Sequence, residues 1–195
     1  GLPECKIVVS NSLDEYIIRD IISQGAEIDA FGVGERLITA KSDPVFGGVY
    51  KLVATEKNGV IEPKIKISEN PGKITNPHYK KVYRIYDNDS GKAIADLLCV
   101  YDETIDEAKP LEIFDPQNTW KRKTITNYHL RELLVPVFQN GECVYTSPSA
   151  AAIRSYCAAQ TDKLWDEVKR FENPHAYYVD LSKKLWDIKQ EMLRK

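Results

Sequence analysis

The sequence has little cysteine and histidine, the residues that most often build disulfide frameworks and metal centres. Only four cysteines occur among 195 residues: Cys5, Cys99, Cys143 and Cys157. They lie far apart and form no C-x-x-C pair, which argues against a zinc site. We therefore expect four reduced, partly buried thiols, as is usual in a cytosolic protein.

The three histidines, His78, His129 and His175, are widely scattered along the chain. No Ser/Cys–His–Asp arrangement stands out that would indicate nucleophilic catalysis. We expect each histidine to have a structural role.

Long apolar runs and a strong net charge are also missing. No apolar stretch approaches the ~20 residues that span a bilayer, and residues 1–5 lack the features of a signal peptide. A net charge of -2 does not indicate a nucleic-acid or membrane partner. The composition is that of a soluble globular protein, which we expect to be cytoplasmic. The chain enters a buried-looking strand within its first residues, which is typical of the middle of a larger protein.

The first part of the chain has the pattern of a βαβ unit. The apolar run 6–9 predicts a buried strand, and Ser12 with Glu15 has the spacing of a capping box that starts a helix. Gly25 is a natural stop for that helix, and 28–31 predicts a second strand. Two strands joined by a helix should be parallel.

Polar and glycine residues follow both of these strands. Ser10-Asn11 comes after the first strand and Gly32-Val33-Gly34 after the second, at the strand ends where α/β proteins bind ligands. Two glycines let backbone N–H groups approach an anion such as phosphate. A tight turn without a ligand and a cap for the next helix remain alternative interpretations. Leu37 stands where a dinucleotide fingerprint needs its third glycine.

The middle of the chain predicts antiparallel β-structure. Turn signals at 57–59, 88–91 and 140–141 separate strand-like segments, and Pro63 indicates an edge or a bulge. The strands we expect are 49–54 with 60–67, 82–86 with 93–101, 111–114, and 133–138 with 143–145.

Two helices are expected after the β-rich part. The first should start at Ser147-Pro148-Ser149 and continue until just before Asn173-Pro174, and the second should cover 180–193. The basic run 120–123 is typical of a solvated face, and the aromatic-rich segment 171–178 of a packing corner between the helices.

These patterns predict a mixed α/β fold in three parts. Residues 1–45 would be the last βαβ part of an irregular α/β barrel, 46–146 an antiparallel β-rich region, and 147–195 a helical segment.

Five collinear segments resemble bacterial nicotinate phosphoribosyltransferases: 6–15, 31–39, 43–52, 131–138 and 164–181. The resemblance runs in order along essentially the whole chain. It implies a fold similar to type II phosphoribosyltransferases, with an α/β barrel beside a β-rich domain. It also implies an enzyme that joins nicotinate to phosphoribosyl pyrophosphate in NAD salvage, forming nicotinate mononucleotide and pyrophosphate. ATP hydrolysis, magnesium and a homodimer belong to the same expectation.

The resemblance places a phosphate site at the two strand ends. It implies that the 5′-phosphate of the ribosyl group is held by Ser10, Asn11, Gly32, Val33, Gly34 and Glu35. Glu35 departs from the family pattern, in which Thr often follows G-V-G. A carboxylate there would repel phosphate unless it turned away or paired, for instance with Arg36.

The family's catalytic segments are not in this sequence. Its phosphorylatable histidine, its nicotinate-binding residues and its D-S-G-D segment would all lie upstream. We therefore expect the chain to be a C-terminal portion that binds phosphate, needs the missing N-terminal half as its partner, binds no metal or ATP alone, and has no catalytic residue of its own. The alternatives are a stand-alone phosphate- or nucleotide-binding module and an inactive truncation product.

Overall fold

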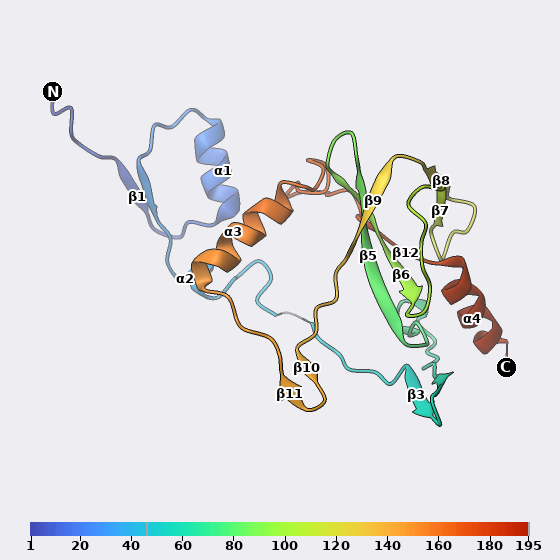
Figure 1. Cartoon of the computed structure of the whole chain (residues 1–195). Coiled ribbons are helices and arrows are strands. Elements are labelled where there is room, and N and C mark those ends of the chain that lie inside the picture. The colour runs from blue at the N-terminus through green and yellow to red at the C-terminus, as the bar shows by residue number, and fades with distance from the viewer. Residues whose placement is uncertain (46, 195) are drawn as a thin grey trace. The chain divides into compact units, whose positions relative to one another are not determined.

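The chain forms two compact units, Gly1–Tyr50 and Lys51–Lys195, each of which is described by itself (Figure 1). The computed structural model describes residues 1–45 and 47–194. Phe46, in the resembling segment 43–52, lies outside the described residues. The architecture is a mixed fold of small sheets and a few helices, which confirms the expected fold class. The strands described form open sheets, and no barrel closes among them.

The unit Gly1–Tyr50 contains the expected parallel βαβ arrangement. Strand β1 (Val8–Ser10) pairs in parallel with β2 (Ala30–Gly32), and helix α1 (Glu15–Ser23) connects them. The short helix α2 (Glu35–Ile38) follows β2. Both strands begin about two residues later than the sequence pattern predicts, but the crossover is as expected.

The start of α1 differs from the predicted capping box. Ser12 adopts a left-handed φ of 52°, so its side chain does not cap the helix. Asp14 is the N-cap instead, and its Oδ1 accepts a hydrogen bond of 2.9 Å from the Ile17 N–H. The helix ends before Gly25, whose φ of +83° confirms it as the stop.

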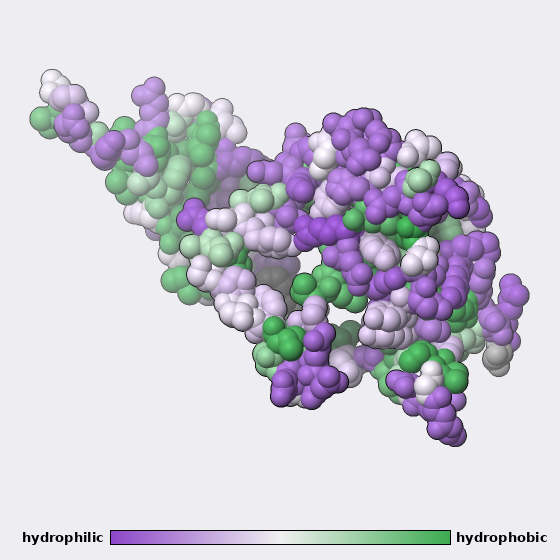
Figure 2. All heavy atoms as spheres, viewed as in Figure 1, coloured by the Kyte–Doolittle hydropathy of each residue, from purple (hydrophilic) through white to green (hydrophobic). Residues whose placement is uncertain are grey.

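This unit buries few apolar side chains. Leu13, at 4% exposure, is its buried hydrophobic residue among those described. Exposed apolar side chains occur at the start of β1 and on both helices: Ile7, Val8, Ile22, Leu37 and Ile38. Figure 2 shows hydrophobic spheres gathered on the surface of this part of the chain. The two strands pair only with each other among the described residues, and the apolar faces of this βαβ unit lack cover within the unit.

The unit Lys51–Lys195 is built on a sheet with the order β12-β6-β5-β9. Strands β5 (Lys80–Asp87), β6 (Ala93–Val100) and β9 (Tyr128–Glu132) are antiparallel neighbours. Strand β12 (Tyr178–Leu181) adds to β6 in parallel. The expected pairing of β5 with β6 is therefore confirmed, and β12 joins them from nearly 80 residues further along the chain.

The two faces of this sheet bury separate clusters, because successive side chains of a strand point to opposite sides. On one face Ala95, Leu97 and Cys99 pack with Ile113 and Ile125 of a second hairpin. That hairpin consists of β7 (Leu111–Phe114) and β8 (Arg122–Ile125). On the other face Val100 and Leu181 pack against Leu185 of helix α4 (Lys183–Leu193).

Two smaller hairpins confirm the local turn signals. Strands β3 (Ala54–Lys57) and β4 (Val60–Pro63) meet at Asn58-Gly59, and β10 (Phe138–Gln139) and β11 (Glu142–Cys143) meet at Asn140-Gly141. All four turn residues have positive φ, which asparagine and glycine tolerate. A 3₁₀ helix, η1 (Pro71–Lys73), interrupts the loop that follows β4.

The predicted long helix is wrong in its length. Helix α3 (Ala150–Thr161) starts as expected after its cap Ser149, but it ends twelve residues before Asn173. The Lys92 amine donates to the carbonyl oxygens of Asp162 (2.6 Å) and Leu164 (3.3 Å), and the Ala93 N–H donates to the Lys163 carbonyl at 2.8 Å. These hydrogen bonds come from residues at the start of β6 and occupy the carbonyl groups that directly follow the helix.

Four further predictions need correction. The expected strand 49–54 is wrong except for its last residue, because the pairing with β4 begins at Ala54, which lies opposite Pro63. The expected strand 133–138 is replaced by β9 before it and the two-residue β10 at its end. The segment 171–178 is no corner between helices, because it leads into β12. The last helix begins at Lys183, since 178–181 belongs to the sheet.

Within the described residues, no helix has both the length and the apolar character needed to cross a membrane.

Candidate functional site

The carboxyl ends of β1 and β2 lie side by side. Ser10 and Gly32 are the last residues of the two strands and are partners in the parallel register. A Cβ atom placed on Gly32 would lie 3.1 Å from the Ser10 Cβ, closer than ordinary van der Waals contact. The strand ends therefore approach each other because residue 32 has no side chain.

The chain leaves β1 through a sharp turn. Asn11 and Ser12 both have positive φ, 86° and 52°, a conformation that asparagine tolerates better than most residues. Because Asp14 caps α1, the side chains of Ser10 and Asn11 are not used as helix caps. Both are exposed at the strand end. Within the described part of the chain their hydroxyl and amide groups make no hydrogen bond, so they are available to contact a ligand at this edge.

Gly34 begins α2 without a capping side chain. Its φ of -101° and ψ of -120° make it the N-cap, and no side chain accepts a hydrogen bond from the first turn. The first N–H groups of any helix have no partner inside it. Gly34 and Glu35 are exposed, whereas Val33 is half-buried. Backbone donors thus point outward beside the strand ends, in the way that favours an anion.

Of the two ways in which Glu35 could avoid repelling phosphate, the pairing with Arg36 is not present among the described residues. Arg36 Nη1 instead forms an ion pair with Asp14 Oδ2, which ties α2 to the start of α1. Arg36 is held there because Asp14 already faces it as the cap of α1. The Ile17 N–H and the Arg36 guanidinium together hold the pKa of Asp14 below its usual value. The Glu35 side chain makes no ion pair among the residues that the structure describes, and it is solvent-exposed.

A small pocket lies beside this ion pair. It has a volume of about 400 Å³ and is lined by residues that include Asp14, Val33, Arg36 and Ser42. The Ser42 hydroxyl donates to the Glu15 carboxylate on one wall. The six residues expected at the phosphate site are thus brought to one edge of β1 and β2. We call this edge, Ser10-Asn11 with 32–35, the strand-end rim.

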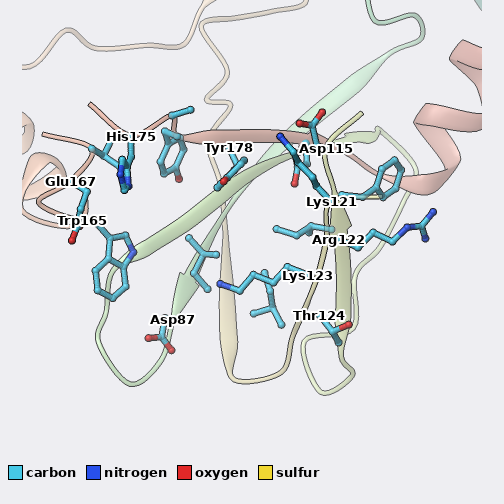
Figure 3. Close-up of a pocket in the computed structure, with 18 of the residues that line it drawn as sticks. Asp87, Asp115, Lys121, Arg122, Lys123, Thr124, Trp165, Glu167, His175 and Tyr178 are labelled. Atoms are coloured by element: carbon cyan, nitrogen blue, oxygen red, sulfur yellow. The ribbon is translucent and has the colours of Figure 1, made fainter. Parts of the chain in front are cut away.

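The unit Lys51–Lys195 contains a larger cleft, of about 1070 Å³, which the sequence did not indicate. Its lining includes Lys121, Lys123, Trp165 and His175 (Figure 3). Asp180 also lines it. The basic run 120–123 is exposed as expected, and its alternation in and next to β8 brings two lysines to the cleft. That alternation was the signal available in the sequence.

The remaining histidines and cysteines form no reactive cluster. His129 stacks on Tyr86 with ring centroids 5.1 Å apart, and the ring nitrogen of His78 accepts from the Tyr79 N–H at 3.0 Å. All four cysteines are free, and Cys99 is the buried one. Burial raises the pKa of its thiol to about 12, so it stays protonated. No group of metal-ligating side chains large enough to hold an ion occurs within residues 1–45 and 47–194.

Comparison with known proteins matches residues 79–189 to the family described as nicotinate phosphoribosyltransferase C-terminal domain. A nicotinate phosphoribosyltransferase of Bacillus subtilis is 39% identical over 193 residues, which are 99% of this chain and 39% of that protein. The human nicotinate phosphoribosyltransferase is 31% identical over 180 residues, 92% of this chain and 32% of that protein.

A solved structure agrees. The crystal structure of human nicotinic acid phosphoribosyltransferase superposes with a TM-score of 0.72 at 25% identity, covering 96% of this chain and 33% of that one. The chain thus spans between about a third and two-fifths of the length of these relatives. The chain belongs to the nicotinate phosphoribosyltransferase family, of which it carries the C-terminal domain.

Proposed function

We propose that this chain is the C-terminal part of an enzyme that forms nicotinate mononucleotide and pyrophosphate from nicotinate and phosphoribosyl pyrophosphate. Its role would be to hold the 5′-phosphate of the ribosyl group at the strand-end rim. Family membership supports the reaction class. The observation that supports the role is the pairing of Ser10 with Gly32, which sets two polar strand ends in contact.

The physical case for phosphate rests on backbone donors. Gly34 leaves the first turn of α2 without a side-chain cap, so its N–H groups are open to an anion. The Ser10 hydroxyl and the Asn11 amide add side-chain donors beside them. Fixed donors contribute by orienting the phosphate end, which positions the ribose for attack at its other end. Short polar contacts of this kind position the substrate and take no part in bond making.

The two charged residues that follow the glycines have separate roles in this proposal. Arg36 is engaged by Asp14, so it holds α2 in place and does not contact the phosphate. Glu35 faces solvent, where water screens its repulsion of a nearby dianion. The backbone of 32–34 then carries most of the binding, and the hydroxyl that family members often have at position 35 is missing here.

Magnesium and ATP are proposed only for the complete enzyme. The residues described here contain no carboxylate or histidine group that fits a metal ion. By the resemblance to the family, the magnesium, ATP and nicotinate sites are assigned to the part of the enzyme that precedes this chain. That part, a homodimer partner and a cytoplasmic setting complete the proposal.

A chimera tests the proposal. The 195-residue chain would be joined to the part of the Bacillus subtilis relative that it does not match, and nicotinate mononucleotide formation would be measured. We expect turnover by the chimera and none by the chain alone. In the chimera, Gly32→Ala should raise the KM for phosphoribosyl pyrophosphate by about tenfold with a smaller change in kcat, because a contact made in ground and transition states alike is weakened.

Gly48→Ala is the matched control, because a Cβ at Gly48 meets nothing within 4 Å. An equal KM change in both variants would contradict the proposed rim. Turnover by the isolated chain would show that it holds a catalytic centre of its own. Phosphate binding by the isolated chain together with an inactive chimera would favour the stand-alone binding module.

A further inference from the structure

The large cleft of the unit Lys51–Lys195 opens at an edge of its main core. The sheet face with Leu97 is covered by the β7–β8 hairpin, and the residues of β12 and β8 line the opening between them. At position 180 of β12, an apolar side chain would extend this core to the mouth of the cleft. The residue present at that position is Asp180.

Asp180 is a buried carboxylate without a protein partner. It pairs with Leu97 across the parallel register, so it shares the face that carries the core, and it is 4% exposed. Its side chain makes no hydrogen bond or ion pair among the residues that the structure describes. No fully enclosed polar side-chain atom there lacks a partner, so the Asp180 oxygens must open onto the cleft that the residue lines. A buried charge in this position is costly unless a ligand pairs with it.

Two lysines on the opposite wall are also unpaired. Lys121 and Lys123 lie two and four positions before Ile125, which is buried in the core, so their side chains lie on the same face of β8 and its approach as Ile125. Neither amine makes an ion pair within the described part of the chain. The intervening Arg122 also lines the cleft, but it is paired with Glu112 at 2.9 Å.

Other acids near these lysines already have partners. Asp115 accepts from the Asn118 side chain at 3.1 Å and from the backbone N–H groups of Gln117 and Asn118. Asp89 accepts from Asn127 at 2.8 Å. The lining also includes Asp87 and Glu167, and these carboxylates stay charged. Among the described residues that line the cleft, Asp180 is thus a buried acceptor without a partner, and the two lysine amines are cations that no ion pair holds.

The cleft also has aromatic walls. Trp165 and Tyr178 line it and remain 43% and 56% exposed. In Figure 3 the Lys123 side chain extends toward the side where Trp165 and Asp87 lie, and Lys121 lies near Asp115 on the other side. A flat ring can lie against such walls, with its polar edge at the carboxylate and an anionic group at the amine.

We propose that this cleft binds a nucleoside phosphate whose base carries an exocyclic amino group. The base edge donates N–H groups to the Asp180 carboxylate, and the phosphate pairs with Lys123. Guanine fits this pattern because its ring N–H and its amino group lie side by side and match the two oxygens of one carboxylate. The inference uses only the unit Lys51–Lys195 and is independent of the strand-end rim.

The acid-base properties of Asp180 agree with this arrangement. Burial and the neighbouring Asp115 raise the pKa of the Asp180 carboxyl to about 6. The carboxylate is therefore ionised at neutral pH, although burial disfavours its charge. Hydrogen bonds donated by a ligand would stabilise the ionised form.

Isothermal titration calorimetry on the 195-residue chain at pH 7.5 tests the proposal with three probes: GMP, IMP and guanosine. IMP lacks only the exocyclic amine, and guanosine lacks only the phosphate. We expect saturable GMP binding, with IMP and guanosine each about tenfold weaker. Asp180→Asn should remove the preference for GMP over IMP, and Lys123→Gln should remove the preference for GMP over guanosine.

Asp187→Asn and Lys109→Gln are the matched controls, because both residues are exposed and paired away from the cleft, with Lys183 and Asp106. They should leave all three affinities unchanged, and thermal denaturation checks that each variant is folded. Absence of saturable GMP binding at millimolar concentration would overturn the proposal. So would equal binding of GMP and IMP, or a loss of affinity in the controls as large as in the cleft variants.

Discussion

At the scale of single residues, Asp180 is a carboxylate in a buried position, where its charge is disfavoured. It is 4% exposed on the core face of β12, without a partner among the residues described. Its pKa of about 6 lies above the ordinary value of 3.8, so the folded chain binds a proton there that the unfolded chain has already lost. The penalty on stability therefore grows as the pH rises from about 4 to about 6 and is fully present above the folded pKa. It disappears as the pH falls toward 4.

Asp180→Asn should therefore raise the stability of the chain at pH 7.5. A shift from 3.8 to about 6 corresponds to roughly 2 to 3 kcal/mol in the free energy of unfolding. Urea denaturation at pH 7.5 and at pH 4 measures the effect, and the gain should vanish at the lower pH. Asp187→Asn, on the exposed face of α4, should give no such gain. A gain independent of pH would mean that the charge of Asp180 is not its cause.

Gly32 illustrates how far single residues could be predicted. The sequence placed Ser10 and Gly32 at neighbouring strand ends, because a βαβ pattern dictates that parallel strands end at one edge. It did not identify Asp14 as the cap of α1 or as the partner of Arg36. Both depend on the left-handed turn at Asn11 and Ser12, whose geometry the capping-box pattern does not contain.

At the scale of elements, local sequence signals were enough to predict the turns. The ends of helices and strands depended on contacts with residues far away in the chain. Asn58-Gly59 and Asn140-Gly141 form turns as expected, because their own backbone preferences suffice. Helix α3 is shorter than its apolar pattern because Lys92, about 70 residues earlier, binds the carbonyls that follow it. The large cleft was not foreseeable for the same reason, since it forms where β12 and β8 are brought together by β6 and β7.

The caps of α3 and α4 allow a matched comparison. Ser182 accepts from the Leu185 N–H at 3.2 Å and donates to Glu103 Oε2 at 2.7 Å, and Leu185 is fully buried. Ser182→Ala should thus lower the global free energy of unfolding by about 1 to 2 kcal/mol. Ser149 caps α3 with the same 3.2 Å geometry, but no residue of α3 is buried.

Ser149→Ala should accordingly loosen α3 without a comparable loss of global stability. Urea denaturation followed by tryptophan fluorescence measures the global term, since Trp186 of α4 packs edge-on against Phe114 with centroids 5.9 Å apart. Hydrogen exchange of 150–161 measures the local term. Equal global losses in both variants would contradict the argument that burial of the capped helix decides the cost.

At the scale of the whole molecule, the two units differ in how much core they contain. The unit Lys51–Lys195 has two buried clusters on the faces of one sheet. The unit Gly1–Tyr50 has Leu13 as its buried hydrophobic residue among those described, while Leu37 and Ile38 are 68% and 85% exposed. So small a core cannot offset the conformational entropy of about 50 residues, each of which costs roughly 1 to 2 kcal/mol to order.

We therefore expect limited trypsin digestion of the isolated chain to cleave first within Gly1–Tyr50. Lys6, Arg19, Arg36 and Lys41 are the available sites there. The fragment that persists should contain β5 to α4, whose backbone is held by the sheet and both clusters. Mass spectrometry of the early products identifies the cut sites, because cleavage requires local unfolding of the chain around each bond.

The chimera with the Bacillus subtilis segment supplies the matched comparison. If Gly1–Tyr50 is the edge of a barrel completed by that segment, its four sites should become resistant while sites in exposed loops of the other unit stay unchanged. Cleavage at equal rates in chain and chimera would show that the preceding segment does not cover these strands. First cleavage inside β5 or β6 would show that the part of the chain with the larger buried core is not the more stable part. That result would contradict the argument from core size.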